Sequence, residues 1–151
     1  MEQNLPLEKE IAGFFAKFPP FPDNVKEILV KIAPYLCILG VVFGGLTLLA
    51  VLGIGVGASA IGVAAYGSVG IYWISMAILA IMVILEGLAI SPLMKRQKKG
   101  WNNLYYVFLL SLVNGVVGFL GIGSIVNSII SLALSFVIGG WILFQTREKY
   151  V

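Results

Sequence analysis

The sequence predicts an all-α integral membrane protein with four transmembrane helices arranged as two hairpins, preceded by an N-terminal amphipathic interfacial helix and a Pro-rich elbow. The first observation is composition, because 60% hydrophobic residues, 11% charged residues and a mean hydropathy of +1.01 are values of a membrane chain. The second is that Asp, Glu, Lys and Arg are absent from Ile32 to Leu85 and from Gly100 to Thr146. The third is the basic stretch Met94–Trp101, which separates these two apolar runs.

Residues 1–31 form a predicted cytoplasmic interfacial segment. Its apolar residues recur at helical spacing, which indicates an amphipathic helix that lies in the membrane interface: Leu7, Ile11, Phe14, Phe15 and Phe18. The prolines of Phe18–Pro22 end this helix and form the elbow. Asn24 and Glu27 then fit a capping box at the start of a second helix. Pro34 is expected to kink that helix into a second elbow near the interface.

Residues 32–151 form the predicted four-helix transmembrane domain. A helix needs roughly 20 apolar residues to cross a bilayer, and the sequence supplies spans at about 33–52, 70–93, 102–120 and 125–144. The glycines of Gly53–Ala60 favour a flexible or re-entrant outer loop, without the Lys-Ser or Lys-Thr that a phosphate loop requires. Gly121–Ser124 is a short outer turn. Trp101 and the Tyr105-Tyr106 pair mark the membrane interface.

All ten Lys and Arg residues lie on one side of these spans, which predicts a multi-pass protein of the plasma or inner membrane with both termini in the cytoplasm. The middle connection contributes Lys95, Arg96, Lys98 and Lys99. These residues set the topology and contact anionic lipid headgroups, with docking of a protein or nucleotide as the alternative. The charge lies in a connection and not on a face, so nucleic acid is not an expected partner.

An internal repeat is a further hypothesis. Leu52–Gly55 matches Leu120–Gly123, and the span that follows each match ends at basic residues. Duplication of a helical hairpin and coincidence both remain open, because Gly and Ile are common in membrane segments.

Small and polar residues form stripes on several predicted spans. In the last span they recur every three or four residues, and therefore share one helix face: Ser124, Ser128, Ser131, Ser135 and Gly139, flanked by Asn127. Comparable sets are Gly40, Gly44 and Thr47 in the first span, and Ser111, Gly115 and Gly118 with Asn114 in the third. We expect these stripes to pack helices together, within the bundle or at a homodimer face. The alternative is a polar pathway lined by the serines.

Glu86 is the only ionisable residue inside a predicted span. Such a group is costly in hydrocarbon, so it is usually buried in protein, neutralised or paired. It shares a helix face with Ser75 and Ser68. Its candidate partners are Asn102, Asn103, Lys99 and Arg147. Proton or cation coupling and a structural interhelical hydrogen bond are both possible, and the candidate polar site comprises Glu86, Ser75, Asn114, Asn127, Ser131 and Ser135.

The residue inventory argues against catalysis. The chain has no histidine, and its only cysteine, Cys37, rules out an internal disulfide or a cysteine-based metal site. We therefore expect no enzyme, no cofactor and no metal. The first hypothesis is a structural or accessory membrane protein that associates with itself or with another membrane protein. The second is a small transporter or channel that uses Glu86 and the serine-lined face for proton or cation coupling, and a lipid-modifying enzyme ranks third.

Overall fold

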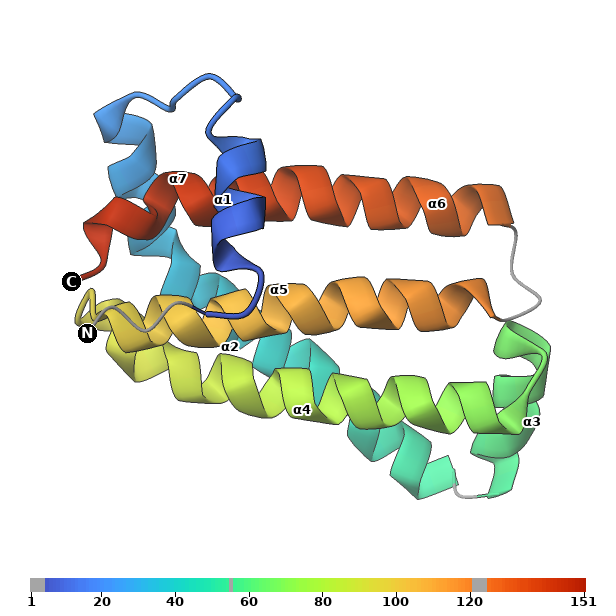
Figure 1. Ribbon diagram of the computed structural model, residues 1–151. Coiled ribbons are helices and arrows are strands. Elements are labelled where there is room, and N and C mark those ends of the chain that lie inside the picture. The colour runs from blue at the N-terminus through green and yellow to red at the C-terminus, as the bar shows by residue number, and fades with distance from the viewer. Residues whose placement is uncertain (1–4, 55, 121–124) are drawn as a thin grey trace.

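The computed structural model describes residues 5–54, 56–120 and 125–151, and all regular structure in those residues is helical (Figure 1). The helices are α1 (Glu8–Phe15), α2 (Asp23–Ile54), α3 (Val56–Tyr66), α4 (Val69–Met94), α5 (Lys98–Phe119), α6 (Ile125–Leu134) and α7 (Gly140–Thr146). A five-residue π-helix, η1 (Ser135–Gly139), joins α6 to α7, and the short 3-10 helix η2 (Arg147–Lys149) follows. The predicted all-helical class is confirmed.

Three helices, α2, α4 and α5, are long and apolar enough to cross a membrane. This finding supports a membrane protein. The segment predicted as the last span is also helical from Ile125 to Thr146. It consists of α6, η1 and α7, which follow one another without a gap. Two predictions fall on residues outside the described ranges. They are the outer turn Gly121–Ser124 and the part of the proposed repeat at Gly55 and Gly121–Gly123.

Helix α4 lies between α2 and α5, and glycines allow close contact on both sides. On α2, a Cβ at Gly44 would lie 2.5 Å from Val83 Cγ2 of α4. On α5, a Cβ at Gly100 would lie 2.7 Å from the backbone nitrogen of Leu93. These spacings leave no room for a larger residue, which explains why the two contacts use glycine.

The predicted capping box at the start of the first span is wrong. Helix α2 begins at Asp23, so Asn24 is not its N-cap, and the Glu27 carboxylate pairs with Arg96 at 2.7 Å. The helix continues without a break through Pro34, which is buried. A proline removes one backbone hydrogen bond, and the intact turns on either side, with neighbouring helices, keep such a helix continuous in a membrane chain.

The glycine-rich segment predicted as a loop is mostly helical. Helix α3 begins at Val56 and packs against α4. Gly62 makes this contact possible, because a Cβ there would lie 2.6 Å from the Tyr72 ring. Glycine costs a helix about 1 kcal/mol per residue. In an apolar setting, satisfying the backbone N–H and C=O groups outweighs that cost.

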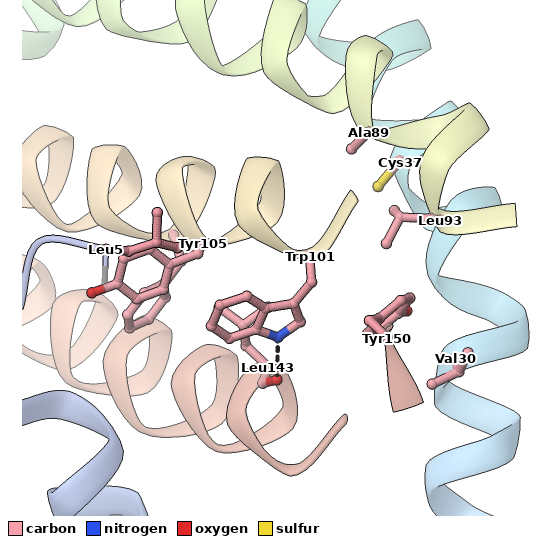
Figure 2. Close-up of a cluster of buried hydrophobic side chains, with 10 residues drawn as sticks. Leu5, Val30, Cys37, Ala89, Leu93, Trp101, Tyr105, Leu143 and Tyr150 are labelled. Carbon is pink, nitrogen blue, oxygen red and sulfur yellow. Dashed lines mark hydrogen bonds between the residues drawn. The ribbon is translucent and has the colours of Figure 1, made fainter. Parts of the chain in front are cut away.

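The core lies at the end of the bundle that holds the C-terminus and the α4–α5 connection (Figure 2). Trp101 and Tyr105 are fully buried, and Trp101 Nε1 donates a hydrogen bond of 2.8 Å to the Leu143 carbonyl. Of the three aromatic residues predicted to mark the membrane interface, Trp101 and Tyr105 therefore face protein and Tyr106 is exposed. Trp101 and Tyr105 are one helical turn apart, so both face α7, whereas Tyr106 points away.

Helix α1 packs on α7, so the N-terminal segment belongs to the folded core. Phe15 is 2% exposed, and its ring occupies the place that a Cβ at Gly140 would take. Glu8 is buried and forms an ion pair with Arg147, whose guanidinium lies 5.5 Å from the Trp101 ring. The prolines separate α1 from α2, as the sequence predicts.

Ion pairs join the start of α2 to the C-terminus. Lys26 Nζ lies 2.6 Å from Glu148 Oε1, and Lys149 Nζ lies 3.1 Å from Asp23 Oδ1. The bond to Asp23 and its charge raise the pKa of Lys149. Arg96 of the α4–α5 connection also pairs with Glu27 of α2. The charged residues of three separate segments therefore lie together at one end of the molecule.

Candidate functional site

The candidate site is a cavity of about 440 Å³ between α2, α4, α5 and the last helix. Its lining is mostly apolar, with Leu36 and Phe108 as examples. Six residues bring polar groups or sulfur to its wall: Cys37, Glu86, Ser111, Ser135, Thr146 and Tyr150. A mostly apolar hollow of this size with a few polar groups has the form of a small-molecule site.

Among the described residues that line the cavity, Glu86 is the only Asp, Glu, Lys or Arg. Its carboxylate lies against the backbone of Gly40 on α2, and a Cβ at that position would overlap Oε2. The side chain is half-buried. Within the described residues, the ion pairs and side-chain hydrogen bonds leave this carboxylate without a partner. The carboxylate is therefore available to a ligand in the cavity.

None of the partners that the sequence suggested for Glu86 is paired with it. Arg147 pairs with Glu8, and Lys99 is exposed. Asn102 has a buried Oδ1 with no hydrogen-bond partner in the described part of the chain. The reason is geometric, because Gly40 on α2 occupies the space beside the carboxylate and none of these residues lines the cavity.

Two of the cavity hydroxyls are satisfied within their own helices. Ser111 Oγ donates to the Phe108 carbonyl at 2.7 Å, and Thr146 Oγ1 donates to the Ile142 carbonyl at 3.0 Å. Tyr150 and Cys37 both line the cavity, and burial raises the pKa of Tyr150 to about 12. The phenol therefore stays neutral at physiological pH. These hydroxyls are neutral, and two of them already donate a hydrogen bond within the protein. Glu86 therefore dominates the electrostatics of the cavity.

The π-helix lies at this cavity. Ser135 and Gly139, the first and last residues of η1, both contribute to the wall. A π segment widens one helical turn, and such segments occur often at functional sites. No protein-family model, no curated protein and no solved structure matches this chain. Function is therefore inferred from the chemistry of the cavity.

The structure brings only part of the predicted polar site together. Glu86 and Ser135 line the cavity. Ser75 and Asn114 lie elsewhere, each with a buried side-chain oxygen that has no hydrogen-bond partner among the described residues. The other predicted members of the site or its stripe have side chains outside the described part of the chain: Asn127, Ser128 and Ser131.

The small residues predicted to pack helices occupy different surroundings. Gly40 and Gly44 face α4, and a Cβ at Gly115 would lie 2.8 Å from Leu132 Cδ1 of α6. Gly118 has open space beside it. Thr47 is exposed and donates a hydrogen bond of 2.8 Å to the carbonyl of Phe43 on its own helix. Gly139 stands at the cavity, where a Cβ would lie 3.6 Å from Phe108.

The basic connection has a structural role beyond its charge. Arg96 makes a bidentate contact with Glu27 of α2, at 2.7 and 3.2 Å, which raises its pKa. The Val151 nitrogen donates to the Arg96 carbonyl at 2.9 Å, and the Lys98 nitrogen donates to the Val151 carbonyl at 2.8 Å. Lys95 and Lys99 are exposed.

Sequence reasoning missed Tyr150 and Thr146 as cavity residues and used Cys37 only to rule out a disulfide and a cysteine-based metal site. Cys37 precedes Gly40 by one helical turn, so a shared face was the available signal. Tyr150 follows the last helical residue. No periodicity in the sequence predicts its position. The backbone hydrogen bonds of Val151 with Arg96 and Lys98 hold this end of the chain beside the cavity.

Proposed function

We propose that the chain is a four-span protein of the plasma or inner membrane with both termini in the cytoplasm. In this proposal α2 and α4 form one hairpin, and α5 forms the other with the continuous α6–η1–α7 segment. Support comes from the ion-paired end of the bundle, where Lys26, Arg96 and Lys149 gather. Cytoplasmic ends of membrane helices are enriched in Lys and Arg.

Within that frame, Glu86 acts as an exchange site for a proton or a monovalent cation in a small transporter. The observation that carries this proposal is the half-buried carboxylate on the wall of a 440 Å³ cavity, with no basic residue on that wall. A single carboxylate in apolar surroundings is stabilised by one proton or one positive charge. The apolar wall would then accept the uncharged body of an organic cation. No metal, cofactor or catalytic group is part of this mechanism.

Proton flux in liposomes tests the exchange role. The protein is reconstituted with a pH-sensitive dye inside the vesicles, and the decay of an imposed pH gradient is followed with and without benzyltrimethylammonium as a model organic cation. We expect Glu86→Gln to abolish cation-dependent decay, because it keeps the shape of the side chain and removes its titration. Glu10→Gln, an exposed position on α1, is the matched control. Equal flux in Glu86→Gln and the unsubstituted protein would refute the proposal.

The second candidate function is a structural or accessory subunit, probed by the same variants. The contact of Glu86 with Gly40 favours it, since a carboxylate fitted onto a neighbouring helix can also hold two helices together. In this case neither protein supports flux, and Glu86→Gln retains the fold because glutamine keeps the shape of the side chain that fits against Gly40. Self-association in this role is tested by the oligomeric state in detergent. The unsubstituted protein is compared with variants on the exposed α2 face, such as Phe43→Ala.

A further inference from the structure

A second pocket lies where α2 meets the end of α4, away from the Glu86 cavity. Its volume is about 370 Å³, and the residues that matter for binding are Lys31, Pro34, Tyr35, Met94 and Arg96. Lys31 immediately precedes Ile32, the first residue of the long uncharged run. The pocket therefore lies at the boundary between charged and apolar chain, which is the level of lipid headgroups in a bilayer.

The pocket carries two positive charges and no acidic residue on its wall. Lys31 is exposed, and the Arg96 side chain is 43% exposed. Glu27 holds the guanidinium of Arg96 at 2.7 and 3.2 Å, so this cation is already oriented before any ligand arrives. A preset guanidinium beside a mobile ammonium suits the oxygens of a phosphate group.

The backbone at Arg96 is also held in a specific conformation. Arg96 has a φ of 54°, which is unusual for a residue other than glycine. Two backbone bonds maintain it: Gln97 N donates to the Pro92 carbonyl at 2.8 Å, and Val151 N donates to the Arg96 carbonyl at 2.9 Å. Non-glycine residues in this region persist where surrounding contacts impose the conformation, often at binding sites.

The remaining wall suits the rest of a phospholipid. Val30, Pro34 and Leu93 contribute apolar groups to it. Met94 and Tyr35 are 54% and 62% exposed and lie where glycerol and the upper acyl chain would pass. Tyrosine is characteristic of this membrane level.

We propose that this pocket binds a phosphate group, supplied by an anionic phospholipid, with Lys31 and Arg96 as the two phosphate contacts. Free inorganic phosphate has the same chemistry and is the other possible source. The site is separate from the Glu86 cavity, shares no residue with it, and depends only on the chain lying in a membrane.

Binding of dioleoylphosphatidylglycerol to the purified full chain in neutral detergent tests the proposal by native mass spectrometry. The comparison arms are dioleoylphosphatidylcholine, which has no net charge, and inorganic phosphate alone. We expect Lys31→Gln to weaken phosphatidylglycerol binding about fivefold, the fold-change that corresponds to one lysine near the surface. Lys17→Gln is the matched control, because it removes the same charge from an exposed residue that does not line the pocket.

The outcomes separate the sources and the alternatives. Preference for phosphatidylglycerol over phosphatidylcholine, lost on Lys31→Gln and kept on Lys17→Gln, supports a lipid phosphate site. Competition by millimolar inorganic phosphate, with the same dependence on Lys31, supports the site and assigns free phosphate as its ligand. Equal losses in the two lysine variants, or equal binding of both lipids, would overturn the proposal. Arg96→Lys is a second variant, since it keeps the charge and removes the bidentate fork.

Discussion

Alanine at Gly44 should destabilise the contact between α2 and α4, whereas alanine at Gly40 should instead displace the Glu86 carboxylate. A Cβ at Gly44 would lie 2.5 Å from Val83 Cγ2. Valine is branched at Cβ and stiff, so relief requires the helices to separate. Insertion of a methyl group into such a contact typically costs about 1–3 kcal/mol. We expect the free energy of unfolding of Gly44→Ala to fall by that amount.

The same methyl group at Gly40 meets a different neighbour. Its overlap is with the terminal carboxylate of Glu86, which can rotate into the adjacent cavity. Moving such a side chain off its preferred rotamer costs about 0.5–1.5 kcal/mol. Gly40→Ala should therefore lose less stability than Gly44→Ala, while it alters cation-dependent flux more strongly.

Reversible unfolding in mixed micelles measures the stability difference, and the liposome flux assay measures the functional one. Gly45→Ala is the matched control, because a Cβ there meets no atom within 4 Å. It should be neutral or slightly stabilising, since alanine favours a helix over glycine by about 1 kcal/mol. Equal destabilisation by all three alanines would refute the assignment of the α2–α4 contact. A flux defect in Gly44→Ala alone would refute the placement of Glu86.

Three further predictions follow from the other contacts. The added methyl group of Gly140→Ala would overlap the Phe15 ring, so we expect this variant to release α1 from α7 and to speed proteolysis near α1. Gly139→Ala is the control, because its nearest contact would be at 3.6 Å and the rate of proteolysis should not change. Cys37 is the only thiol, is buried and lines the same cavity as the buried Tyr150, so Tyr150→Ala should open access to it and accelerate its labelling by a maleimide several-fold. Unchanged labelling would contradict a shielding role for Tyr150. The pKa of Tyr150 is raised from 10.0 to about 12, so the stability that its burial contributes is complete below pH 10 and is lost as the pH rises towards 12. The free energy of unfolding between pH 9 and 12 should therefore fall less steeply in Tyr150→Phe than in the unsubstituted protein.

Prediction from sequence succeeded where one segment carries its own signal. The long apolar helices α2, α4 and α5 follow from uncharged runs of sufficient length. The prolines at 19–22 separate α1 from α2 for an equally local reason, since three prolines in four residues cannot continue a helix. Local signals misled in the glycines of α3, because backbone hydrogen bonding and neighbouring helices outweighed intrinsic propensity.

The candidate site was predictable only in part. Glu86 stood out because a carboxylate inside an apolar run is costly, a property that the sequence displays directly. Its neighbour Gly40 was identified as a packing residue, but the sequence does not show that these two positions meet. The hydroxyl of Tyr150 and the thiol of Cys37 reach the same cavity from separate segments, which no pattern within either segment records.

By itself the sequence determined the helical class, the apolar segments, the charged end and the lone intramembrane carboxylate. Each of these is a property of a single segment, since hydrocarbon requires a segment to satisfy its own backbone and to exclude charge. Only the tertiary structure decided that Trp101 is buried, that Glu86 lies on Gly40, and that Tyr150 near the C-terminus lines the same cavity as Glu86. Those features depend on which faces of distant helices meet, and close packing of particular side chains selects that pairing.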